Sequence, residues 1–75
     1  MNIYFLEEKK EIRVHIYKPL YKLLEIMDKF NSEMSGVLTC TEAKYIHNGQ
    51  TQFTISDAIV SNVPKIFEWF NFNCQ

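Results

Sequence analysis

The chain has 75 residues, of which 47% are hydrophobic and 23% are charged, with only two glycines and two prolines. These values exclude a disordered tail, a repeat array and a two-domain enzyme, and they predict one compact domain over residues 1–75. A chain this short buries only about 60% of its unfolded surface, so its aromatic residues must supply much of the core.

The charge balance gives the chain no strong long-range field, either to attract polyanions or to imitate them. Eight Lys and Arg oppose nine Asp and Glu, for a formal net charge of -1. The isoelectric point of about 6.1 lies well below the values, above about 9, that are usual for nucleic-acid-binding domains.

Two cysteines, Cys40 and Cys74, are too few for a secreted disulfide scaffold, and no apolar run approaches the roughly 20 residues of a membrane span. We therefore expect a cytoplasmic protein with reduced thiols and no membrane partner.

The first part of the chain predicts a β-hairpin. Residues 3–6 and 12–17 are β-branched and aromatic runs, and the charged stretch 7–11 between them is typical of an exposed turn. The second run alternates, with three aliphatic residues on one face: Ile12, Val14 and Ile16. Three long polar residues share the other face: Arg13, His15 and Tyr17.

The next segment predicts an amphipathic helix. Pro19 fits its first turn, where the missing N–H of proline needs no partner. Apolar residues then recur at intervals of three and four: Leu20, Leu23, Leu24, Met27 and Phe30. The pattern ends between residues 31 and 36.

Two further β-prone runs flank the dipeptide Asn48-Gly49, and they cover residues 37–47 and 50–55. This dipeptide is the strongest short hairpin signal, because a type I′ turn needs positive φ at both central positions. A two-residue loop predicts a register in which Tyr45 lies opposite Gln52. Tyr45 is therefore expected on the uncovered face of the sheet.

The last part of the chain predicts short helical segments, capped by Ser56 with Asp57 and by Asn62. The expected apolar stripe of the final helix is Val63, Ile66, Phe67 and Phe70. The fold class is then α+β, a ββαββα two-layer sandwich with a four-stranded antiparallel or mixed sheet and two helices on one face. If the second and fourth strands are neighbours, this layout is a circular permutation of the ferredoxin-like arrangement.

No motif predicts chemistry. The spacing of His15, His47, Cys40 and Cys74 matches no zinc pattern, and the chain has neither a nucleophile elbow nor a phosphate loop. A chain of this length also leaves little scaffold for a concave pocket of several hundred cubic ångström. We expect no metal, no cofactor and no enzymatic activity.

Aromatic residues crowd the C-terminal helix. On a helical wheel Trp69 lies about 60° outside the expected apolar arc, and Phe72 lies further round. One small core can hardly hold them all, so we expect Trp69 and Phe72 to anchor another protein. The alternative is that Trp69 lies along the edge of the sheet with its indole N–H in water and that Phe72 folds back over the first helix. Tyr45 would be a third apolar anchor, with Arg13 and His15 as polar contacts at the rim.

These residues predict a small non-enzymatic protein-binding module that modulates, and in our interpretation inhibits, a macromolecular partner by occupying a surface. Small regulators of phages and mobile elements share this size and composition. The uncharged run at residues 37–41 also predicts a homodimer through a sheet edge. The alternative is a nucleic-acid-binding regulator that uses the strand face of Arg13, His15 and Tyr17, with cations, including nearby lysines, for phosphates and an aromatic ring for stacking on bases.

Overall fold

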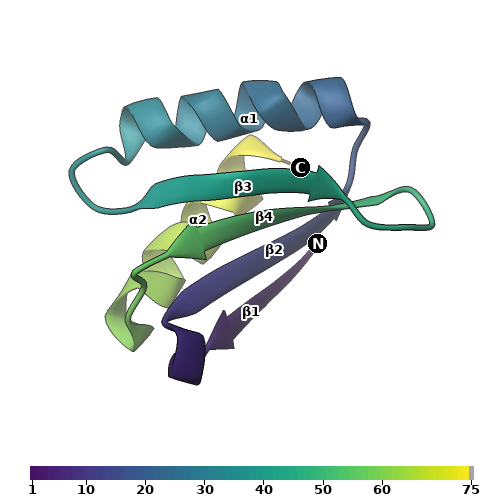
Figure 1. Ribbon diagram of the computed structural model, residues 1–75. Helices are drawn as coiled ribbons and strands as arrows, with labels where there is room; N and C mark the ends of the chain where they lie inside the picture. The colour runs from purple at the N-terminus through teal and green to yellow at the C-terminus, as the bar shows by residue number, and fades with distance from the viewer. Residues whose placement is uncertain (75) are drawn as a thin grey trace.

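The computed structural model describes residues 1–74, except for the side chain of Leu20 (Figure 1). Its elements follow the predicted ββαββα order, with two short 3-10 turns, η1 and η2. They are β1 (Asn2–Leu6), η1 (Glu7–Lys9), β2 (Glu11–Tyr17), α1 (Leu20–Glu33), β3 (Thr39–Tyr45), β4 (Gln50–Ser56), η2 (Val60–Asn62) and α2 (Val63–Asn73).

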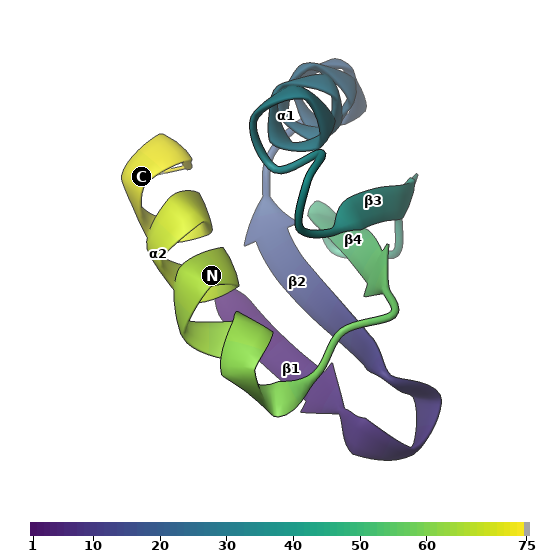
Figure 2. The same ribbon diagram turned by 90° about the vertical axis from the view of Figure 1, so that its left-hand side faces the viewer.

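The four strands form one sheet in the order β1-β2-β4-β3, and every neighbouring pair is antiparallel. The second and fourth strands are therefore adjacent, as the circularly permuted ferredoxin-like layout requires. Both helices cover the same face of the sheet, with α2 on the β1 side and α1 on the β3 side (Figure 2). The predicted α+β two-layer fold is confirmed.

The core lies between this covered face and the two helices. Alternate residues of the central strands point into it: Ile12, Val14 and Ile16 from β2, and Thr51, Phe53 and Ile55 from β4. The helices meet them with Leu23, Phe30, Ile66, Trp69 and Phe70. Burial of each large apolar side chain contributes about 1.5–3 kcal/mol to the hydrophobic driving force of folding.

In each helix the face that is buried differs from the predicted apolar stripe by a rotation about the helix axis. In α1 Leu24 is half exposed, and Ile26 packs against the core in its place. Leu20 belonged to the predicted stripe, but its side chain lies outside the described part. In α2 Phe67 is 51% exposed while Trp69 is buried. The cause is that α2 packs against α1 as well as the sheet, so its buried arc turns toward α1.

The turn between β3 and β4 has the predicted conformation with one extra residue. Asn48 and Gly49 have φ of 56° and 75°, and the Gln50 N–H donates to the His47 carbonyl at 3.0 Å. These are the features of a type I′ turn. However, it is the Ile46 N–H that donates to the Gln50 carbonyl, at 3.0 Å. One residue of the β3 side is therefore bulged out beside the turn.

This bulge shifts the register, so the predicted pairing of Tyr45 with Gln52 is wrong. Tyr45 lies opposite Thr51 instead, on the covered side of the sheet that Phe53 also faces, so its expected place on the uncovered face is wrong as well. A second irregularity, between Cys40 and Glu42, inserts one more residue on the β3 side and shifts the register by a further position, so Cys40 faces the core as the alternation predicted. Neither insertion has a sequence signature that alternation alone could reveal.

The predicted helical cap at Ser56 with Asp57 is also wrong. Strand β4 continues through Ser56, and Asp57 turns the chain with φ of 60°. Asn62 does cap a helical segment, but its Oδ1 accepts the Ile59 N–H at 2.9 Å and so closes η2 rather than α2.

Candidate binding groove between the two helices

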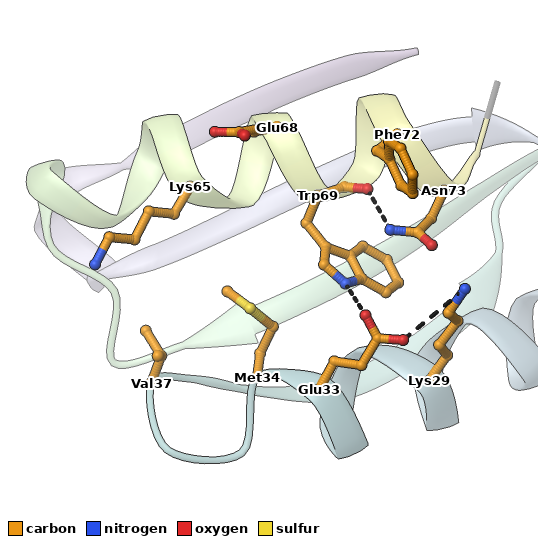
Figure 3. A pocket seen from close by; sticks show the side chains of 9 residues that line it. All are labelled: Lys29, Glu33, Met34, Val37, Lys65, Glu68, Trp69, Phe72 and Asn73. Atoms are coloured by element: carbon orange, nitrogen blue, oxygen red, sulfur yellow. Dashed lines mark hydrogen bonds and ion pairs between the residues drawn. The ribbon is translucent and has the colours of Figure 1, made fainter.

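A groove of about 570 Å³ runs between the C-terminal half of α1 and one side of α2 (Figure 3). We call it the α1–α2 groove. Its lining comprises Lys29, Glu33, Met34, Val37, Lys65, Glu68, Trp69, Phe72 and Asn73. The expectation that so short a chain leaves little room for a concavity of this size is wrong, because two helices side by side on one sheet form a groove without any additional scaffold.

Trp69 is held firmly in the groove. Its side chain is 9% exposed, and its ring packs edge-to-face on Phe30 with centroids 5.1 Å apart. Its Nε1 donates to Glu33 Oε1 at 3.0 Å, and Lys29 Nζ lies 3.8 Å from the other carboxylate oxygen. The indole is thus both a core residue and part of the groove wall, with its polar atom satisfied.

Phe72 stands at the opening of the groove and is 86% exposed. It follows Trp69 by three residues, so helical periodicity places it on the neighbouring side of α2, in line with Lys65 and Glu68. Val37, in the turn after α1, is also exposed and lies among the lining residues. An apolar opening is therefore bordered by charged residues of both signs.

The five predicted contact residues do not form one surface. Trp69 and Phe72 line the groove, whereas Arg13 and His15 alternate with the buried residues of β2 and so lie on the opposite, uncovered face. Tyr45 lies at the far end of β3. The structure therefore separates the expected polar rim from the expected anchors.

On the uncovered face the polar side chains bond to one another. Arg13 Nε lies 2.7 Å from Glu11 Oε1, and His15 Nε2 lies 2.9 Å from Gln52 Oε1. The His15 ring also contacts Tyr4 edge-on, with centroids 5.1 Å apart.

Tyr45 takes part in a smaller concavity at the end of the sheet. Its hydroxyl accepts the Gly49 N–H at 3.1 Å, and with Tyr17, Lys18 and Pro19 it borders a hollow of about 400 Å³. The apolar lining is small, and its two tyrosines are already engaged, because the Tyr17 hydroxyl accepts a hydrogen bond from Gln50 at 2.8 Å.

The two thiols are poorly suited to nucleophilic chemistry at neutral pH. Burial raises the pKa of Cys40 to about 11, and burial also raises the pKa of Cys74. Because the thiolate is the reactive form, both thiols are less activated than a free cysteine. Within residues 1–74, no group of three or more His, Cys, Asp or Glu side chains is placed to hold a metal ion.

Seven of the nine groove residues escaped the sequence reading: Lys65, Glu68 and Asn73 on α2, and Lys29, Glu33, Met34 and Val37 on the α1 side. Lys29 and Glu33 belong to the polar side of α1, and Met34 and Val37 follow the helix, where periodicity gives no signal. Only the docking of α2 makes them neighbours of Trp69.

Comparison of the chain with protein-family models, with curated proteins and with solved structures finds no match. Neither helix in the described part of the chain has the length and apolar character needed to cross a bilayer.

Proposed function

We propose that the protein is a small non-enzymatic module that binds another protein through the α1–α2 groove and modulates it by occupying its surface. The observation that carries this proposal is Phe72, which is 86% exposed beside an apolar opening. Transfer of such a phenyl ring from water into an apolar interface contributes about 2–3 kcal/mol of favourable free energy to binding. Large aromatic residues in this position are the usual anchors of protein interfaces.

The composition of the groove indicates the kind of partner segment. Its centre is apolar, through Met34, Val37 and Trp69, and its α2 border carries Lys65 and Glu68. An amphipathic helix matches this pattern, because its apolar side chains enter the groove while its charged side chains meet charges of opposite sign at the border. Inhibition would follow where that helix is part of the partner's working surface.

The test is affinity capture of the tagged protein from its native cell, with Phe72→Ser beside the wild type. We expect this variant to weaken binding by about 30-fold, which corresponds to about 2 kcal/mol at a central anchor. Its melting temperature should not change, because the side chain is exposed.

Tyr21→Ser is the matched control, since Tyr21 is an exposed aromatic residue of α1 outside the groove. This variant should retain the partner. Equal capture by wild type and Phe72→Ser would refute the groove as the contact surface.

A further inference from the structure

The two edge strands of the sheet differ in how well they are protected against pairing with a further strand. At the β3 edge the Cys40 N–H donates to Asn31 Oδ1 at 2.7 Å, and Asn31 Nδ2 donates to the Cys40 carbonyl at 3.2 Å. The side chain of Asn31 thus occupies the positions that a further strand would take. The strand also bears the charged residues Glu42 and Lys44 and a bulge, both of which oppose edge pairing. The expectation of an unprotected edge at residues 37–41 is therefore wrong.

The β1 edge has none of these protections. The strand Asn2–Leu6 contains no charged residue and no proline, and its pairing with β2 runs through five successive positions without a bulge. Within residues 1–74, no turn or loop backbone group bonds to Ile3 or Phe5. An uncharged, regular edge of this kind is a template for strand addition.

The register identifies the backbone groups that β1 leaves free. In antiparallel pairs hydrogen-bonded and non-bonded positions alternate, and each residue directs its N–H and C=O to the same neighbour. Cys40 directs both groups outward, so Ile55 opposite it must bond to Ile12 on its other side. Ile12 then does not bond to Phe5, its partner in β1. The N–H and C=O of Phe5, and by alternation those of Ile3, point away from the sheet.

A second feature on the same side of the molecule is Phe67. Trp69 faces α1, since it contacts Phe30 and Glu33. Phe67 precedes it by two residues and so lies about 160° around the helix, on the side that faces away from α1. Because α2 covers the β1 side of the sheet (Figure 2), the half-exposed Phe67 ring is directed toward the region beyond the β1 edge.

We propose that a second copy of the chain pairs with this one through β1, antiparallel and about a two-fold axis at Tyr4. Ile3 then exchanges two hydrogen bonds with Phe5 of the partner subunit. By symmetry, Phe5 exchanges two more with Ile3 of the partner subunit. The result is a continuous eight-stranded sheet. The two α2 helices lie side by side across the axis and cover Phe67.

Symmetry favours a second copy over an unrelated strand. The two residues with free backbone groups lie one position before and one position after Tyr4, so a two-fold axis there satisfies all of these groups at once. Tyr4 itself would face Tyr4 of the partner subunit in a non-hydrogen-bonded pair, in which side chains approach most closely. Both rings are exposed in the single chain.

The experiment is sedimentation equilibrium of the wild type, Tyr4→Lys, Tyr4→Glu and an equimolar mixture of the two variants. We expect the wild type to be dimeric at tens of micromolar. Each variant alone should dissociate at least about ten-fold more readily, because like charges then face each other at the axis. The mixture should regain the dimer, since opposite charges meet, and this recovery cannot arise from a folding defect.

Two further variants complete the test. Phe67→Asp should also weaken the dimer, whereas Phe72→Ser should leave it intact because the α1–α2 groove lies on the other side of α2. A monomeric wild type at hundreds of micromolar overturns the proposal. So does a dimer that persists in Tyr4→Lys and Phe67→Asp, or a mixture that stays monomeric while the wild type is dimeric. The groove proposal is unaffected by these outcomes.

Discussion

Cys40 shows how burial controls a single side chain. Its thiol lies in the core beneath β3, and desolvation is the main reason why its pKa rises from 9.0 to about 11. Hydrogen bonds to backbone groups of Glu42 and Thr54 oppose this rise without cancelling it. The native state therefore holds the Cys40 proton more tightly than the unfolded chain does.

This difference predicts a loss of stability in alkali. Between pH 9 and pH 11 the unfolded chain releases the Cys40 proton while the folded protein retains it, so the free energy of unfolding falls as pH rises. The raised pKa of Cys40 contributes about 2–3 kcal/mol to the free energy of unfolding, and this contribution is fully present below pH 9. Urea denaturation at several pH values measures it, with Cys40→Ala as the control in which tyrosines and lysines still titrate. Parallel pH profiles for the two proteins would contradict the prediction.

Trp69 and Phe72 are close in sequence but are expected to respond oppositely to truncation. Trp69→Ala should cost about 3–5 kcal/mol in the free energy of unfolding, because it removes a ring packed against Phe30 and Phe70. Phe72→Ala should change it by no more than about 0.5 kcal/mol, because the ring is exposed. Chemical denaturation of both variants measures the difference. A small cost at Trp69 would show that the indole is not part of the core.

At the level of secondary-structure elements, the contact between α1 and β3 depends on one side chain. Asn31 lies near the end of α1, and its amide makes both hydrogen bonds to Cys40. This reciprocal pair fixes the helix against the edge strand and satisfies backbone groups that would otherwise be free. It also explains why the β3 edge is closed while the β1 edge is open.

Asn31→Ala should therefore destabilise the protein by about 1–3 kcal/mol, because it leaves the Cys40 backbone donor and acceptor without partners. Hydrogen exchange should report faster exchange of the Cys40 amide in particular. Asn71→Ala is the control, since Asn71 is an exposed asparagine of α2. If the Cys40 amide stays equally protected in Asn31→Ala, the side chain is not what closes this edge.

At the scale of the whole molecule, the arrangement of charge bears on the nucleic-acid alternative. The uncovered face carries Tyr4, His15 and Tyr17, whose rings could stack on bases. Two cations of its strands are neutralised locally, because Arg13 pairs with Glu11 at 2.7 Å and Lys44 pairs with Glu42 at 3.4 Å. A surface with little net charge gains little from counterion release.

We accordingly expect no retention of single-stranded DNA or RNA in a gel-shift experiment, even at low salt, where phosphate contacts are strongest. Glu11→Gln is the informative variant, since it releases Arg13 and should increase any weak binding. Wild-type binding that falls steeply with added salt would restore the nucleic-acid interpretation and weigh against a purely protein-binding role.

The helices and strands were largely predictable from the sequence because their signals are local. Alternation identified β2 and its buried face, and the positive φ demanded by Asn48-Gly49 was predicted correctly. The candidate site was less accessible. Trp69 and Phe72 were identified because they are aromatic residues outside the predicted apolar stripe of the last helix. The groove that they line also depends on Met34 and Val37, which carry no periodic signal.

The amino-acid sequence alone determined the order of elements and the apolar content of the core, because periodicity and turn chemistry act over a few neighbouring residues. Only the tertiary structure decided which side of α2 is buried, which face Tyr45 occupies and which edge of the sheet is closed. Each of these depends on a contact between segments distant in sequence: the packing of α2 on α1, the bulges between β3 and β4, and the pairing of Asn31 with Cys40. Their energies depend on how the elements dock, which local patterning does not encode.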